Sequence, residues 1–180
     1  MVDILDEVKK EYVKDLVSKG KRPSGRGFEE LRKPVVEQNV IPNAEGSARV
    51  HWGKTQVLVG VKMGLGTPFP DRPEEGVLST NAELLPLASP VFESGPPSAE
   101  SIELARVVDR GIRSSNVIDL KSLFIEEGKV WNVFVDIYVL DHDGNLIDAA
   151  ALAAMAALQC TKQPKLENKK VVYGQYAGNL

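Results

Sequence analysis

The sequence predicts an α+β fold in which a mixed β-sheet carries helices packed on one face. The predicted elements follow the order helix, run of strands, helix, strand, helix, which is typical of this class. The segment Lys129–Leu140 alternates Trp131, Val133, Val135, Ile137 and Val139 with partly apolar residues, as a strand in the centre of a sheet does. With 180 residues, the chain is long enough for one domain with a substantial core.

Three segments have helical periodicity. Residues 3–19 place Leu5, Val8, Tyr12 and Leu16 on one face and end at Gly20. A second helix is predicted after Ser98, a suitable N-cap with Glu100 in the first turn, and extends to about Ser115. Residues 147–161 form an alanine-rich third helix, whose small side chains favour close packing against a sheet.

Strands are predicted from apolar alternation between turn residues. Gly53-Lys54 is a candidate hairpin turn, whereas the three prolines and three glycines of Gly64–Gly76 argue against regular structure there. The predicted strands contain Val35, Val36, Val40 and Ile41, then Ser47–Trp52, Thr55–Met63, Val77–Leu85, Leu123–Ile125, Lys129–Leu140 and Lys170–Tyr176.

Composition limits the classes of function. The formal net charge is -3, whereas proteins that hold nucleic acid by bulk electrostatics are usually basic, so RNA binding would need a local basic cluster or an assembly. A single cysteine, Cys160, excludes an internal disulfide and argues against a cysteine zinc site. The charged first ten residues do not fit a signal peptide, and no run of ~18 apolar residues fits a membrane span. We therefore expect a cytoplasmic location.

The second predicted helix carries three arginines, Arg106, Arg110 and Arg113, whose spacings of four and three place them on one face. Guanidinium groups suit phosphates because they present planar, paired donors. The alternative interpretation is that these arginines pair with Glu103 and Asp109 on a solvated helix face, as is common on exposed helices.

A second basic cluster lies in the loop that contains Lys19, Lys21, Arg22 and Arg26. It has the charge to contact a polyanion, although such runs are more often solvated connectors.

A complete catalytic set is not evident. Asp143, Asn145 and Asp141 fit turn and cap positions better than a calcium loop, because the glycine comes too early and no glutamate follows at the twelfth position. Asp148 suits the first turn of a helix, and Asp136 completes this group of acids. The two histidines, His51 and His142, offer little material for a nucleophile–base pair. We predict no catalytic residue, metal ligand or cofactor.

Three long strings carry a resemblance to a known family. TQVLVGVKMGLGTPFPDRPEEGVLSTNAELLPLASPVFESGPP, ELARVVDRGIR and VWNVFVDIYVLDHDGNLIDAAALAAMAAL are similar to the non-catalytic RNase PH-like ring subunit of archaeal exosomes. The similarity extends from about Val8 to Pro164. One departure is Ser24, which stands where the family usually has aspartate in its Lys-Arg-x-Asp-Gly-Arg stretch.

The resemblance implies an RNase PH-like fold, also seen in domain 2 of ribosomal protein S5 and usually present twice in one chain. It implies that residues 1–30 form an N-terminal helix and basic loop, that residues 31–165 form the first RNase PH-like domain, and that residues 166–180 are a tail or the start of a second unit.

It further implies a hexameric ring with a catalytic partner subunit that removes nucleotides from single-stranded RNA in the 3′-to-5′ direction with phosphate, together with RNA-binding cap subunits. Arg106, Arg110 and Arg113 fall where the family presents arginines to RNA. The alternative is a self-sufficient phosphorolytic exoribonuclease, which in this family needs carboxylates from the second unit.

Overall fold

The computed structural model describes residues 4–167 and 170–180, which separate into two compact units, residues 1–33 and 34–180. In the first unit, α1 (Ile4–Ser18) confirms the predicted N-terminal helix. Asp3, at which that helix was predicted to begin, and the side chain of Leu5 lie outside the description. Val8 and Tyr12, on the predicted apolar side of α1, are exposed.

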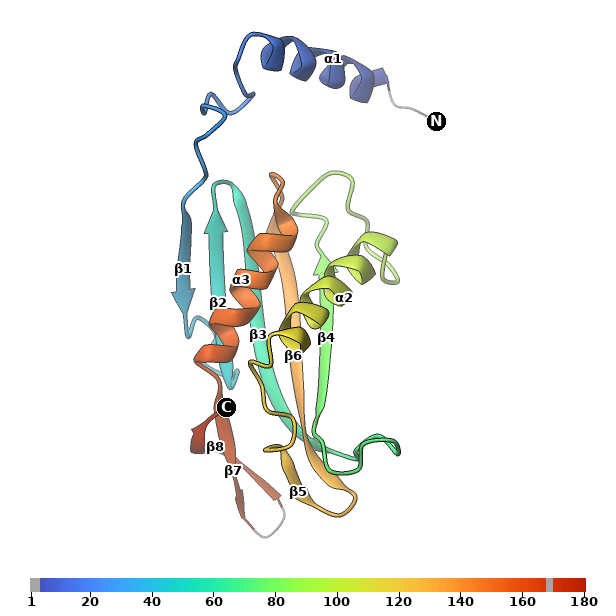
Figure 1. Ribbon diagram of the computed structural model, residues 1–180, viewed down its shortest axis with the longest axis vertical. Coiled ribbons are helices and arrows are strands. Elements are labelled where there is room, and N and C mark those ends of the chain that lie inside the picture. Colours follow the sequence, from blue (N-terminus) through green and yellow to red (C-terminus); the bar gives the residue numbers. More distant parts are fainter. Residues whose placement is uncertain (1–3, 168–169) are drawn as a thin grey trace. The chain divides into compact units, whose positions relative to one another are not determined.

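The second unit contains a mixed sheet with the strand order β1-β2-β3-β6-β4, as Figure 1 shows. All neighbouring strands are antiparallel except β4 and β6, which are parallel, and the short β5 pairs with β6. The strands are β1 (Pro34–Gln38), β2 (Gly46–Trp52), β3 (Thr55–Gly66), β4 (Val77–Leu84), β5 (Phe124–Glu126) and β6 (Lys129–Asp141).

Two helices, α2 (Ala99–Ser114) and α3 (Leu146–Gln159), lie on the same face of this sheet (Figure 1). The predicted cap of α2 is confirmed, because the Ser98 hydroxyl accepts a hydrogen bond from the Ser101 N–H. Asn145 precedes α3 in the left-handed conformation and makes no side-chain cap. The predicted α+β class, with a mixed sheet and helices on one face, is therefore confirmed.

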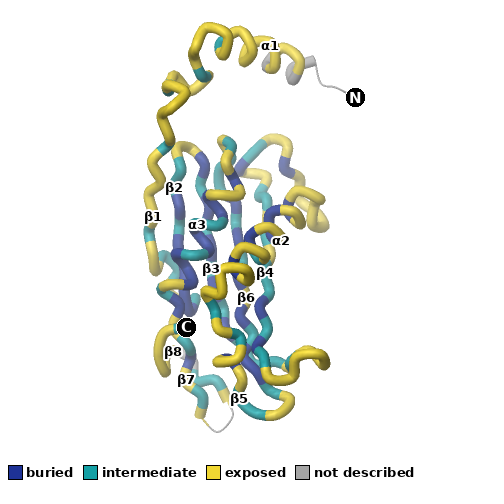
Figure 2. The backbone as a smooth tube through the Cα atoms, viewed as in Figure 1, coloured by how far each residue is buried: buried dark blue, intermediate teal, exposed yellow. Residues whose placement is uncertain are grey.

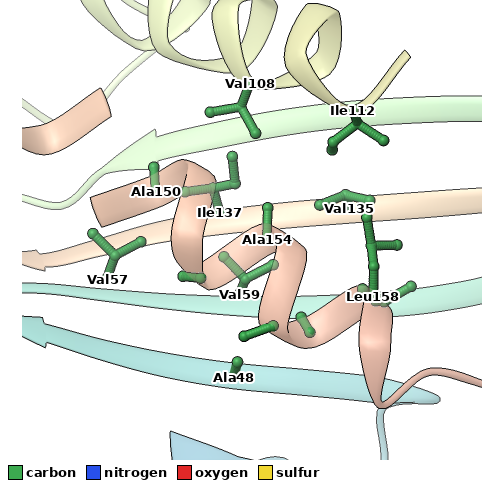
Figure 3. Close-up of a cluster of buried hydrophobic side chains, with 14 of the residues drawn as sticks. Ala48, Val57, Val59, Val108, Ile112, Val135, Ile137, Ala150, Ala154 and Leu158 are labelled. Carbon is green, nitrogen blue, oxygen red and sulfur yellow. The ribbon is translucent and has the colours of Figure 1, made fainter. Parts of the chain in front are cut away.

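The core lies between the sheet and the two helices. Alternate residues of β3 and β6 are fully buried, among them Val57, Val59, Val135 and Ile137. They meet Ala150 and Ala154 of α3 and Val108 and Ile112 of α2 (Figure 3), and Figure 2 shows buried segments along β3 and β6. A fully buried valine or isoleucine contributes about 1.5–3 kcal/mol, so this layer holds the second unit together.

Alanine lets α3 approach the sheet closely, as predicted. Six alanines of α3 are buried. Gly46 at the start of β2 completes the fit, since a Cβ atom there would lie 2.5 Å from the Ala157 carbonyl oxygen and 2.8 Å from the Thr161 Cα.

Several predicted boundaries were wrong. Val40 and Ile41 lie outside β1, because Asn39 takes a positive φ of 58° and ends the strand. Gly64–Gly66 continues β3 instead of opening an irregular loop, and Asp141 ends β6 instead of lying in a turn. The strand predicted at 170–176 is present as β8 (Lys170–Asn179), but its partner β7 (Lys162–Glu167) was not predicted.

The sheet face away from α2 and α3 is less buried. β6 is central, as predicted, yet Phe134 on this face is 37% exposed, and Tyr138 and Leu140 are only partly buried. The partly apolar residues on this face of β6 are therefore not fully buried, although the strand lies in the interior of the sheet.

Candidate nucleic-acid interface

The arginine-bearing side of α2 is set by the residues that the helix buries. Leu104, Val108 and Ile112 face the core at helical spacing, together with Ser101 and Ala105. Arg106, Arg110 and Arg113 therefore lie on the exposed side, and all three side chains are exposed. Figure 2 shows this division as alternating buried and exposed segments along α2.

Arg113 is held by the fold. Its Nε lies 2.7 Å from Asp109 Oδ2, and its Nη2 donates a 2.8 Å hydrogen bond to the carbonyl oxygen of Leu78 in β4. Asp109 also accepts a hydrogen bond of 3.1 Å from the Thr80 hydroxyl. This network fastens the last turns of α2 to the edge strand of the sheet, so the ion-pair interpretation is confirmed for Arg113 and Asp109.

Arg106 and Arg110 differ from Arg113. Among the residues that the structure describes, neither makes an ion pair or a side-chain hydrogen bond, and the predicted pairing with Glu103 is not formed. Their guanidinium groups keep all five donors for a ligand. The arginine face therefore contains one anchored and two available guanidinium groups.

A pocket of about 470 Å³ adjoins the C-terminal end of α2. Arg113 lines it together with Arg72, from the loop between β3 and β4, and Lys121, from the loop after α2. Arg72 and Lys121 were not predicted as site residues. For Arg72 the sequence shows only a basic residue inside a proline-rich loop, which does not reveal a tertiary neighbour.

In the basic loop of the first unit, most of the basic side chains contact other residues of the same unit. Arg22 donates to the Phe28 carbonyl oxygen and lies over the Phe28 ring, while Arg26 donates to the Glu30 carbonyl oxygen. Arg26 Nε also donates to Ser24 Oγ at 3.1 Å, so serine retains a local acceptor at the position where the resembling family has aspartate. Lys19 pairs with Asp15. These contacts favour the connector interpretation of this loop.

The four aspartates considered as a group in the sequence lie at separate positions in the second unit. Asp136 lies on the more open sheet face, where it accepts a hydrogen bond of 3.4 Å from Asn81. Asp141 ends β6, Asp143 follows it in the turn, and Asp148 lies in the first turn of α3. Within residues 4–167 and 170–180, no group of three or more acidic, histidine or cysteine residues is arranged to hold a metal ion.

The open sheet face also carries negative charge. Burial, followed by the nearby carboxylates of Glu83 and Asp136, raises the pKa of the Tyr138 hydroxyl above its ordinary value of 10.0. The carboxylates of Glu83 and Asp136 thus lie near Tyr138 on this face. No helix in the described part of the chain is long and apolar enough to cross a membrane.

The mixed sheet with two helices packed on one face defines the second unit as an α+β domain. The family model described as "3′ exoribonuclease family, domain 1" matches residues 30–164. The chain therefore belongs to the RNase PH family, as the resemblance predicted.

Several similar proteins come from archaea. The chain is 60% identical over 163 residues to an exosome complex component Rrp42 of Methanocella arvoryzae, covering 90% of this chain and 63% of that protein. The protein of the same name from Archaeoglobus fulgidus is 61% identical over 163 residues, with the same two coverages, and that of Thermococcus onnurineus is 50% identical over 180 residues, covering 99% of this chain and 64% of the relative. The chain thus spans just under two thirds of the length of these relatives.

Solved structures agree. A chain of the Archaeoglobus fulgidus exosome with RNA bound to the active site superposes with a TM-score of 0.85 at 61% identity, covering 90% of this chain and 64% of that chain. A chain of an archaeal exosome core gives a TM-score of 0.81 at 54% identity, with coverages of 94% and 64%.

Proposed function

We propose that this chain is the RNA-binding, non-catalytic ring subunit of an archaeal exosome, in which a partner subunit carries out phosphate-dependent 3′-to-5′ degradation of single-stranded RNA. The observation that carries the proposal is the pair of available guanidinium groups on α2, in a chain 50–61% identical to exosome components named Rrp42. The hexameric ring, the RNA-binding cap subunits and a cytoplasmic location belong to the same proposal.

The proposed role of α2 is to hold the RNA backbone. Arg106 and Arg110 are one helical turn apart, with about 5–6 Å between their Cβ atoms, so both reach the same stretch of a bound strand. Arginine contacts to phosphate position a strand without reading its sequence. Arg113 contributes less directly, because Asp109 and the Leu78 carbonyl group already occupy most of its donors.

The acids near this face support a non-catalytic role. Two carboxylates of α2 lie near the arginine row. Asp109 already pairs with Arg113 and accepts from Thr80, whereas Glu103 is exposed and makes no ion pair with the described residues. A general acid or base must instead be within reach of the reacting group and able to exchange its proton there. We therefore assign the chemistry to the partner subunit.

The test removes the two available arginines together in the natural full-length protein. We expect Arg106→Ala/Arg110→Ala to weaken binding to a single-stranded oligonucleotide and to reduce the slope of log affinity against log salt by about 1.4, or ~0.7 for each phosphate contact. Fluorescence anisotropy at several salt concentrations measures both quantities.

A matched control removes the same charge elsewhere. Lys54→Ala/Lys170→Ala changes two exposed lysines away from α2 and should leave the affinity and the salt slope close to those of the unmodified protein. Equal effects of the two double variants, or no effect of either, would contradict the assignment of RNA binding to α2.

A second candidate function is a self-sufficient phosphorolytic exoribonuclease, which the description of the matching family favours. Incubation of the full-length protein with RNA and inorganic phosphate separates the two functions. The non-catalytic proposal expects nucleoside diphosphates only after a catalytic RNase PH-like subunit is added. Their release by this protein alone would overturn it.

A further inference from the structure

A groove of about 790 Å³ lies at the N-terminal end of α2. The end of β4, the loop of residues 85–98 and the first turn of α2 form its walls. The charged residues that line it are Glu83, Glu93 and Glu100, and no described lysine or arginine lines it. Three acids without a basic neighbour in the wall favour a cationic ligand.

The charge of α2 changes along its length. Arg110 and Arg113 lie in its last two turns, whereas Glu100 and Glu103 lie in its first two. Among the described residues, neither of these acids forms an ion pair. Glu100 also lines a second pocket, of about 310 Å³, together with Glu103 and the 44% exposed Ile147 at the start of α3. The acidic and partly apolar surface thus continues from the groove toward α3.

The loop of residues 85–98 holds two large apolar side chains out of the core. Leu87 is 72% exposed and Val91, which lines the groove, is 75% exposed. The loop itself is anchored, because Ala88 and Phe92 are buried and the Phe92 ring lies 5.4 Å from that of His142. The His142 N–H also donates to the Ala88 carbonyl oxygen at 3.1 Å. An anchored loop that exposes apolar side chains is typical of an interaction surface.

The third wall of the groove is a free strand edge. β4 is the last strand in the sheet order and pairs with β6 alone among the described strands (Figure 1). The Leu78 carbonyl oxygen accepts from Arg113 at 2.8 Å, so the backbone groups of Leu78 point away from β6. By the alternation of a strand, those of Ala82 and Leu84 point the same way, and both residues line the groove. No proline interrupts β4, so this edge is suited to pair with an extended segment.

We propose that this groove binds an extended segment of a protein partner that carries lysine or arginine together with large apolar side chains. The segment adds as a strand to β4 at Ala82 and Leu84, its apolar side chains cover Val91 and Leu87, and its basic side chains pair with the groove acids. The inference is independent of the proposed RNA-binding function, because it uses the opposite end of α2.

Other occupants leave part of this surface unused. A metal ion would not need Leu87 or Val91, and the described part of the chain contains no group of three acidic, histidine or cysteine residues that could hold one. RNA would bring its phosphates to the acids of the groove. A basic and apolar segment instead matches the acids, the apolar residues and the strand edge together.

The test uses the natural full-length protein and a labelled, acetylated decapeptide in which lysine, leucine and threonine alternate. We expect Leu87→Ser/Val91→Ser to weaken binding about tenfold, because apolar burial is lost. Glu93→Gln/Glu100→Gln should weaken binding about threefold at low salt and flatten its salt dependence. Fluorescence anisotropy measures the affinities. Circular dichroism checks that each variant is folded.

Two double variants serve as matched controls. Val35→Ser/Val36→Ser changes two exposed valines of β1, the strand at the other end of the sheet order. Glu74→Gln/Glu127→Gln removes two exposed acids that line neither the groove nor the second pocket. Both should leave the peptide affinity unchanged. Hydrogen exchange adds a direct readout, since the bound peptide should slow exchange in the segment that contains Ala82 and Leu84.

The chemistry of the ligand is tested by altered peptides. Replacing the leucines by serine, or the lysines by glutamate, should abolish binding. Equal binding of the lysine–serine peptide would reduce the effect to net charge and overturn the inference. So would an equal loss in the control variants, or no binding of the original peptide to the unmodified protein. Oligonucleotide affinity should be unchanged in every groove variant, and its loss there would assign the groove to RNA instead of a protein segment.

Discussion

The helices α2 and α3 lie on the same face of one sheet but have opposite chemistry. α3 packs over β2 and β3, toward the middle of the sheet, and six of its alanines are buried. α2 packs over the edge strand β4 and buries one side only. Position in the sheet therefore decides which helix builds the core and which one has a side available for a ligand.

Small side chains allow α3 to pack close to the sheet. Ala149, Ala150, Ala153 and Ala154 are fully buried against the sheet. The Thr161 hydroxyl, just after the helix, donates to the Ala157 carbonyl oxygen at 2.8 Å, directly where Gly46 approaches. Any added volume at this contact must displace backbone atoms and not merely side-chain ends.

Gly46→Ala should therefore give the largest effect on stability. The new methyl group would overlap the Ala157 carbonyl oxygen and the Thr161 backbone, and overpacking of this kind costs about 1–3 kcal/mol of the free energy of unfolding. Urea denaturation followed by circular dichroism measures the change. RNA affinity of the folded fraction should not change, because Gly46 lies beneath α3. A neutral effect on stability would mean that α3 is not tightly seated on β2.

The core and the arginine helix were predictable from the sequence because both are encoded locally. Alternation in β3 and β6 and helical spacing in α2 reveal which sides are buried. The sequence did not predict that hydrogen bonds anchor Arg113. Its partner Leu78 is 35 residues away and meets it only because α2 packs on β4.

The pocket and the terminal hairpin were missed for related reasons. Arg72 and Lys121 come from two loops, and only the folded chain brings them to the pocket that Arg113 lines. Pro164 and the flanking charges of β7 obscure its strand character, which depends on pairing with β8. Such features depend on tertiary neighbours and leave little periodicity to detect.

A smaller effect is expected from Asp109→Asn, which removes the anchor of Arg113. The exposed ion pair contributes roughly 0.2–1 kcal/mol, so unfolding should become easier by that order. RNA affinity should rise, because a negative charge leaves the arginine face and Arg113 gains donors for phosphate. Anisotropy titration and urea denaturation of the same protein measure the two changes.

Asp148→Asn in the first turn of α3 is the matched control for that charge. It should also cost about 0.3–1 kcal/mol, since an acid near a helix N-terminus is favourable. It should leave RNA affinity unchanged because Asp148 lies on α3 and not in the arginine row of α2. An equal gain in affinity from both variants would indicate a general charge effect and contradict a specific role of the α2 face.

A change of the opposite sign is expected from Gly111→Ala in α2, the counterpart of Gly46→Ala. A Cβ atom at Gly111 meets nothing within 4 Å, and glycine inside a helix is about 0.5–1 kcal/mol less favourable than alanine. The variant should therefore unfold at slightly higher urea concentration. Gly111 is exposed next to Arg110, so the added methyl group also tests how closely bound RNA approaches α2. Unchanged RNA affinity would mean that the RNA contacts only the guanidinium groups. A clear loss would mean that the RNA backbone lies directly against α2.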